Sequence, residues 1–136
     1  MKKLEKIQSK ILDDGINIYE SHNEVIKVAA VEFDNKKAIF FDESKFDNSS
    51  EMHVALAHEY HHFKTHTLYN FLTDDTTKRK CEYRANKSMI QDIIPIKEFR
   101  KALLLGLERY ELAEEFDVTE DTIDLAYMIY KNMGEL

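Results

Sequence analysis

Three side chains near the middle of the chain have the types and the spacing that bind a catalytic metal ion. His58, Glu59 and His62 form the pattern H-E-x-x-H. On a helix, residues four apart project from the same face with about 5–6 Å between their Cβ atoms, so two imidazoles can converge on one zinc ion. Glu59 lies roughly 100° further around the helix, given about 3.6 residues per turn. Its carboxylate is therefore beside the ion, where it can take a proton from an activated water molecule.

A catalytic zinc ion needs a third protein ligand, and the sequence narrows its type. The metzincin spacing would place a glycine at Thr65 and a histidine at Leu68, and both are absent. We therefore expect a carboxylate from a second helix, and Glu82 is the best candidate. It lies on one face of a predicted helix, and the other residues of that face are Asn86, Met89, Ile90 and Ile93. A carboxylate and an amide on an apolar face are costly to bury unless a metal ion and a liganding histidine satisfy them.

The same residues also have an interpretation without a metal ion. H-E-x-x-H has only three fixed letters, and four of the 6 histidines lie between residues 58 and 66, as on an exposed polar helix face. Glu82 could pair with Lys78 or Lys80 at the surface instead. The combination of the two segments favours a metal site.

The site helices follow a predicted β-hairpin. Apolar residues dominate 28–33 and 37–42, and turn-forming residues separate the two segments. Two strands are not stable alone, so we expect them to pack on a helix. The sequence predicts an α+β fold, with a small antiparallel β-sheet packed on the H-E-x-x-H helix and several further helices.

Both histidines fall in a helix predicted over residues 49–68. Asn48, followed three residues later by Glu51, resembles a capping box and marks its start. Glu82 falls in a helix predicted over 76–93, which Pro95 ends. Four more helices are predicted, over 3–14, 96–106, 109–116 and 119–133. We expect a catalytic core at residues 1–95 and a helical C-terminal subdomain, resembling a helix-turn-helix and packed on that core, at 96–136.

Composition excludes several classes of protein. A length of 136 residues, with 43% hydrophobic and 33% charged residues, is typical of a folded domain rather than a disordered chain. The single cysteine, Cys81, excludes an intrachain disulfide and a cysteine-rich zinc module. No apolar stretch reaches the length of a signal peptide or the roughly 20 residues of a membrane span. We expect a cytoplasmic protein without membrane contact.

The C-terminal segment has the outline of a helix-turn-helix but the wrong charge for DNA. The whole chain carries a net charge of −7. Glu120, Asp121 and Asp124 occupy the second helix, where a DNA reader carries basic or amide side chains. An acidic chain repels the phosphate backbone, so we do not expect direct nucleic-acid binding.

The chain resembles the ImmA/IrrE family of zinc metallopeptidases in three segments. They are His58-Glu59-x-x-His62, Glu82-Tyr83-Arg84-Ala85-Asn86 and Ile93-Ile94-Pro95. The resemblance covers roughly residues 15 to 133 and implies a zincin-like minimal metallopeptidase fold. Many members have a glycine just before the second histidine, where this chain has His61, three residues after His58 and able to compete as a ligand.

The resemblance implies a zinc ion, Zn2+, held by His58, His62 and Glu82, with Glu59 as the catalytic general base. It also implies an intracellular endopeptidase whose protein substrate is a helix-turn-helix transcriptional repressor, often that of a mobile element. The alternative is a zinc-binding regulatory or protein-interaction module without catalysis, which would not need Glu59. Four side chains are candidates for stabilising the oxyanion: His66, Tyr69, Tyr83 and Tyr110. We expect the substrate strand to add to the sheet edge, which a proline near Ile39 would test.

Overall fold

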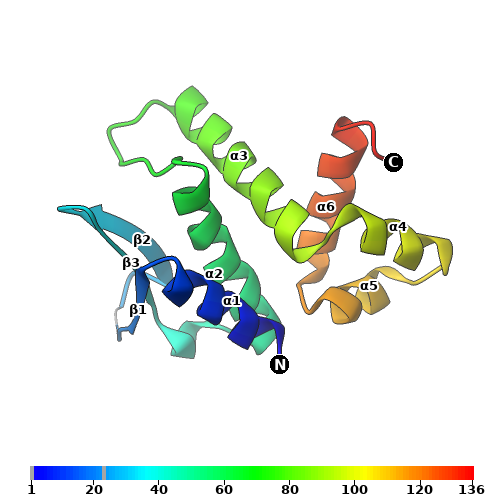
Figure 1. Ribbon diagram of the computed structural model, residues 1–136, viewed down its shortest axis with the longest axis horizontal. Helices are drawn as coiled ribbons and strands as arrows, with labels where there is room; N and C mark the ends of the chain where they lie inside the picture. The colour runs from blue at the N-terminus through cyan, green and yellow to red at the C-terminus, as the bar shows by residue number, and fades with distance from the viewer. Residues whose placement is uncertain (1, 23) are drawn as a thin grey trace.

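The polypeptide forms one helix, then a small sheet, and then a series of further helices. The computed structural model describes residues 2–22 and 24–136, so Met1 and Asn23 of the predicted 1–95 core lie outside the described residues. The elements in chain order are α1 (Lys3–Asp13), β1 (Ile16–Glu20), β2 (Val28–Phe33), β3 (Lys36–Phe41), a short 3-10 helix (Glu43–Lys45), α2 (Ser49–Lys64), α3 (Asp75–Ile93), α4 (Ile96–Leu104), α5 (Arg109–Phe116) and α6 (Glu120–Asn132). The sheet lies at one end of the molecule and α4–α6 at the other, with α1–α3 between them (Figure 1).

The sheet is mixed, with the strand order β1-β3-β2. The predicted antiparallel hairpin is confirmed as β2 and β3, and its turn residues Asp34 and Asn35 both have positive φ, as a tight hairpin turn requires. The strand β1 was not predicted, and it pairs with β3 in parallel, so the sheet is not purely antiparallel. Because β1 has only five residues, its alternation of apolar and polar side chains is too short to distinguish a strand from a loop. Ile39 lies in the central strand, and the two edges belong to β1 and β2.

The active-site helix α2 begins where the sequence predicts and ends earlier. The Asn48 side chain accepts a hydrogen bond from the Glu51 backbone N–H at 2.9 Å, which confirms the cap. The helix was predicted to reach residue 68 but ends at Lys64, because His66 adopts a left-handed conformation with φ 54°. The Thr67 N–H then bonds back to the His62 carbonyl at 3.0 Å, a Schellman-type end. This turn brings Thr67 against the last turn of the helix.

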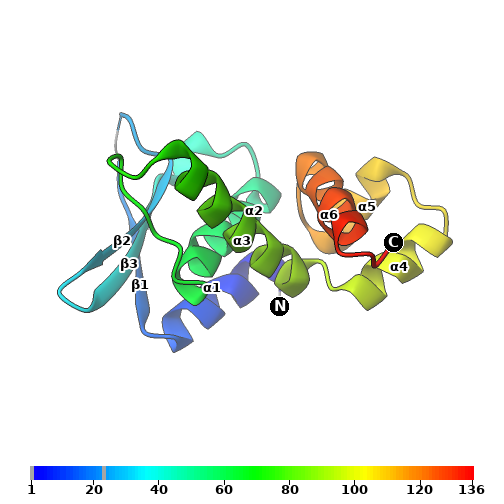
Figure 2. The ribbon, with the colours of Figure 1, turned by 90° about the horizontal axis from the view of Figure 1, so that it is seen from above.

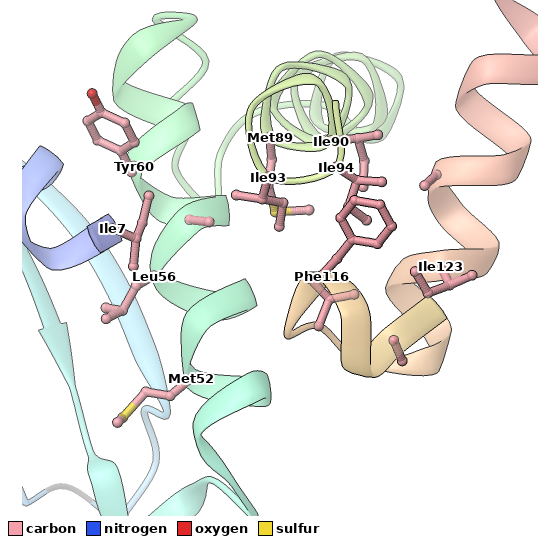
Figure 3. Close-up of a cluster of buried hydrophobic side chains, with 14 of the residues drawn as sticks. Ile7, Met52, Leu56, Tyr60, Met89, Ile90, Ile93, Ile94, Phe116 and Ile123 are labelled. Atoms are coloured by element: carbon pink, nitrogen blue, oxygen red, sulfur yellow. The ribbon is translucent and has the colours of Figure 1, made fainter. Parts of the chain in front are cut away.

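One continuous apolar core joins the sheet side of the molecule to the C-terminal helices. Figure 3 shows Ile7 and Leu56 between α1 and α2, and Ile90 and Phe116 between α3 and α5, all in this core. The apolar face of α3, with Met89, Ile90 and Ile93, is buried in this core. Its burial fixes the rotation of α3 about its own axis and thereby the direction in which Glu82 projects.

The turn between α5 and α6 is attached to the first turns of α2. Asp117 has the left-handed conformation, with φ 53°, and its carbonyl accepts a hydrogen bond from the buried His53 Nδ1 at 2.8 Å. The Ser50 hydroxyl donates to the Asp117 carboxylate. These bonds place the start of α6 beside α2, and Figure 2 shows α4–α6 grouped at the end of the molecule away from the sheet. The division of the chain at residue 95 stays a prediction.

Within the described residues, no helix combines the length and the apolar character that crossing a membrane requires.

Candidate metal centre

Two helices bring three potential metal ligands together. His58 and His62 lie one turn apart on α2, and their Nε2 atoms are 3.1 Å apart. Glu82, on α3, places Oε2 at 2.9 Å from His58 Nε2 and Oε1 at 3.2 Å from His62 Nε2. The three donor atoms lie within 4.8 Å of one another. The predicted convergence of the two histidines and Glu82 therefore exists in the structure.

Hydrogen bonds on the far side of each ring fix which nitrogen faces the cluster. His58 Nδ1 donates to the Asn86 side-chain oxygen at 2.8 Å, a partnership that the sequence predicted. His62 Nδ1 lies 3.2 Å from the Thr67 carbonyl oxygen and 3.0 Å from its hydroxyl. Since a carbonyl only accepts, the Nδ1 atoms carry protons, and in the neutral rings the Nε2 lone pairs face the cluster.

This donor set fits a divalent cation. Two imidazole lone pairs and a carboxylate at these distances repel one another unless a positive charge lies among them. Two nitrogens and one oxygen are also a protein ligand set of catalytic zinc sites. Burial lowers the pKa of His62, which keeps the ring neutral and able to coordinate. Burial opposes ionisation of Glu82, but the hydrogen bond that the Tyr69 hydroxyl donates to the carboxylate helps to lower the pKa of that carboxyl.

Glu59 lies beside the cluster and not within it. Its carboxylate shares a small cavity, of about 140 Å³, with His62, Glu82 and Ala30 of β2. Burial raises the pKa of Glu59 above its ordinary value, with Glu82 adding to the rise and His58 opposing it. A carboxyl group with a raised pKa next to a metal site is suited to accepting and returning a proton.

Of the four candidate oxyanion residues, Tyr69 is the one that contacts the cluster among the described residues. Its hydroxyl donates to Glu82 Oε1 at 2.6 Å, and its ring meets that of His62 edge-on with centroids 6.1 Å apart. The hydrogen bond to Glu82 raises the pKa of Tyr69 to about 12, so the hydroxyl remains a donor at neutral pH. His66, Tyr83 and Tyr110 do not line the small cavity at the cluster, whereas Tyr69 does. Sequence reasoning had no basis for choosing Tyr69, because its position depends on the early end of α2.

Replacing Tyr69 with phenylalanine is expected to weaken zinc binding about 10- to 100-fold, because the carboxylate loses the hydrogen bond that orients it. Competition with a chromophoric chelator measures this dissociation constant directly. Tyr83→Phe, which removes a hydroxyl from an exposed position of the same helix as Glu82, is the matched control. Equal zinc affinity for Tyr69→Phe and the wild-type chain would show that the hydrogen bond does not position the ligand.

His61 projects away from the cluster. Its Nδ1 lies 2.6 Å from the Ser88 hydroxyl and its Nε2 lies 2.9 Å from Asp92 Oδ2. Burial opposes ionisation of Asp92, but hydrogen bonds from His61 and Lys10 outweigh it and lower its pKa to about 2. His61 thus ties α2 to α3 instead of competing for the metal site, and Asp92 extends the link to α1 through Lys10. Cys81 is half-buried and is not part of the cluster.

A small sheet on an H-E-x-x-H helix, with a glutamate supplied by the following helix, defines a zincin-like arrangement. The chain belongs to the Peptidase_M78 family, described as the IrrE N-terminal-like domain, whose model matches residues 13–127. The family match confirms the resemblance found in the sequence and supports a metallopeptidase-type function. No curated protein and no solved structure shows significant similarity to the chain.

Proposed function

We propose that this protein is a zinc-dependent endopeptidase that cleaves a specific protein in the cytoplasm, a helix-turn-helix transcriptional repressor. The observation that carries the proposal is the pair of Nε2 lone pairs directed at Glu82, with Glu59 next to them. His58, His62 and Glu82 would hold the zinc ion, and three protein ligands leave a position open for chemistry. A structural zinc site would be closed by a fourth protein ligand.

The chemistry divides between the ion and the protein. When bound, zinc supplies Lewis-acid activation of water and of the scissile carbonyl group. Glu59 accepts the proton of the attacking water and returns it to the leaving amine, a double role that suits its raised pKa. Asn86 and Thr67 hold the two imidazoles in the tautomer that leaves Nε2 free, and Tyr69 orients Glu82.

The exposed edge of β2 is the element that would align the substrate. Ala30 of β2 shares the small cavity with Glu59 and Glu82, so a strand added to this edge passes directly over the cluster. Backbone hydrogen bonds would then give affinity with little sequence preference. The proline that tests strand addition therefore belongs in β2, since Ile39 lies in the central strand and is fully buried.

The repressor as substrate is supported by the family resemblance and by charge. The chain carries a net charge of −7, and Glu120, Asp121 and Asp124 gather around Arg109 at the exposed surface of α6. An acidic surface steers a basic DNA-binding partner toward the peptidase.

Co-expression with small helix-turn-helix repressors, above all with any whose gene adjoins the gene of this protein, tests the proposal. We expect two repressor fragments in zinc-replete medium, with masses that locate one cleaved bond, and an intact repressor when 1,10-phenanthroline removes the metal. A repressor that binds the protein and stays intact under both conditions would favour the non-catalytic zinc-binding module.

A further inference from the structure

An apolar groove adjoins the metal cluster on the side of the C-terminal helices. Its volume is about 520 Å³, and it lies between β2 and α2 on one side and the first turns of α6 on the other. His58, Glu59 and Asn86 line the end at the cluster. The apolar lining comes from Val28, Phe46, Val54, Ala55, Met89 and Leu125. The groove therefore opens directly onto His58 and Glu59, two residues of the proposed active site.

The lining favours an apolar occupant. The charged groups at the rim already have partners, since Lys27 pairs with Glu51, and Asp121 lies 3.3 Å from Arg109. A volume of this size lies within the usual range of ligand pockets and exceeds that of one phenylalanine or leucine side chain. Water in contact with these apolar walls is released when such a side chain enters, which is favourable.

The polarity of β2 indicates which substrate residue reaches the groove. Antiparallel addition is the commoner form of strand pairing and the slightly more stable one. Val28 lines the groove, and Ala30, two residues further along β2, lies at the cluster. A strand running antiparallel to β2 passes Ala30 first and Val28 afterwards. Residues that follow the cleaved bond therefore lie over the groove.

We propose that this groove selects the substrate by binding a large apolar side chain, that of the residue immediately after the cleaved bond. The proposal rests on the proposed peptidase function and adds a specificity determinant to it. Leu125 of α6 forms the wall opposite α2, so the C-terminal helices take part in substrate selection. The attachment of Asp117 to Ser50 and His53 holds that wall in place.

A binding experiment tests the groove without any cleavage. The probe is N-acetyl-phenylalanine amide, added to zinc-loaded protein with isotope-labelled methyl groups. We expect NMR shift changes at the methyl groups of Val28, Val54, Met89 and Leu125, and none of comparable size with N-acetyl-alanine amide. Absence of shifts at these four residues would overturn the proposal, whatever the protein cleaves.

Cleavage of a mixture of peptides randomised at their central positions tests whether the residue in the groove precedes or follows the cleaved bond. We expect large apolar residues to be enriched at least about tenfold immediately after the cleaved bond. Leu125→Trp, which fills the groove, should shift the preference to alanine and glycine, whereas Leu125→Ala should admit tryptophan. Met128→Trp, on an exposed position of the same helix, is the control and should keep the wild-type profile.

Two outcomes of the cleavage experiment would overturn the inference while the peptidase assignment stands. They are a profile without apolar preference after the bond, and a wild-type profile in both Leu125 variants. If zinc-loaded protein cuts neither the peptide mixture nor a co-expressed repressor, the proposed function fails, and the methyl shifts still decide whether the groove binds an apolar side chain.

Discussion

Glu59→Gln is expected to lower kcat/KM for substrate cleavage about 10²- to 10⁴-fold, the range contributed by a positioned general base. Glutamine keeps the size of the side chain and its place beside His58, but it cannot take a proton from water. The zinc affinity should stay close to that of the wild type, because Glu59 is not one of the three clustered donors. Cleavage rates and metal content measured on the same preparation separate the two roles.

Glu115→Gln provides the control for this experiment. It makes the same chemical change at an exposed position of α5, and it should leave both the rate and the zinc content unchanged. Undiminished cleavage by Glu59→Gln would show that another group accepts the proton. Loss of zinc from Glu59→Gln would instead make Glu59 a ligand and require a different arrangement of the site.

His62→Ala is expected to weaken zinc binding by more than about 100-fold, beyond the loss usual for a residue that only supports a ligand. Two protein ligands then remain, and cleavage should fall with the metal content at micromolar zinc. Glu82→Gln, which preserves the shape of the third ligand, should have the same effect through loss of the charge. Titration against a chromophoric chelator, with circular dichroism to confirm the helical content, measures this outcome.

His66→Asn is the matched control for His62→Ala. His66 is exposed just beyond α2 with a left-handed backbone, a conformation that asparagine tolerates better than alanine does. Its removal should leave zinc affinity unchanged. Wild-type affinity in His62→Ala, or a comparable loss in His66→Asn, would contradict the assignment of the ligands.

The main parts of the site could be predicted from the sequence because they depend on helical periodicity. The spacing of His58 and His62 and the positions of Glu82 and Asn86 on one face follow from 3.6 residues per turn. The Asn48 cap sets the start of α2, and Pro95 limits α3. These local signals leave little freedom in how the two helices present their polar residues.

The remaining parts depend on contacts between residues distant in sequence or on a backbone turn without a glycine. The parallel strand β1 is stabilised by pairing with β3, which local propensity does not show. The left-handed turn at His66 could not be predicted, because the residue there is not a glycine. This turn nevertheless brings Thr67 to His62 and begins the loop that carries Tyr69. The wall that Leu125 adds to the groove likewise depends on how α6 is attached to α2.

The most direct test is an anomalous diffraction measurement at the zinc edge on crystals grown with zinc. A single strong peak is expected where His58 Nε2, His62 Nε2 and a Glu82 carboxylate oxygen converge, at about 2.0–2.2 Å from each. A map without density among these atoms, with the Glu82 side chain directed into solvent, would contradict the metal centre and the peptidase function built on it.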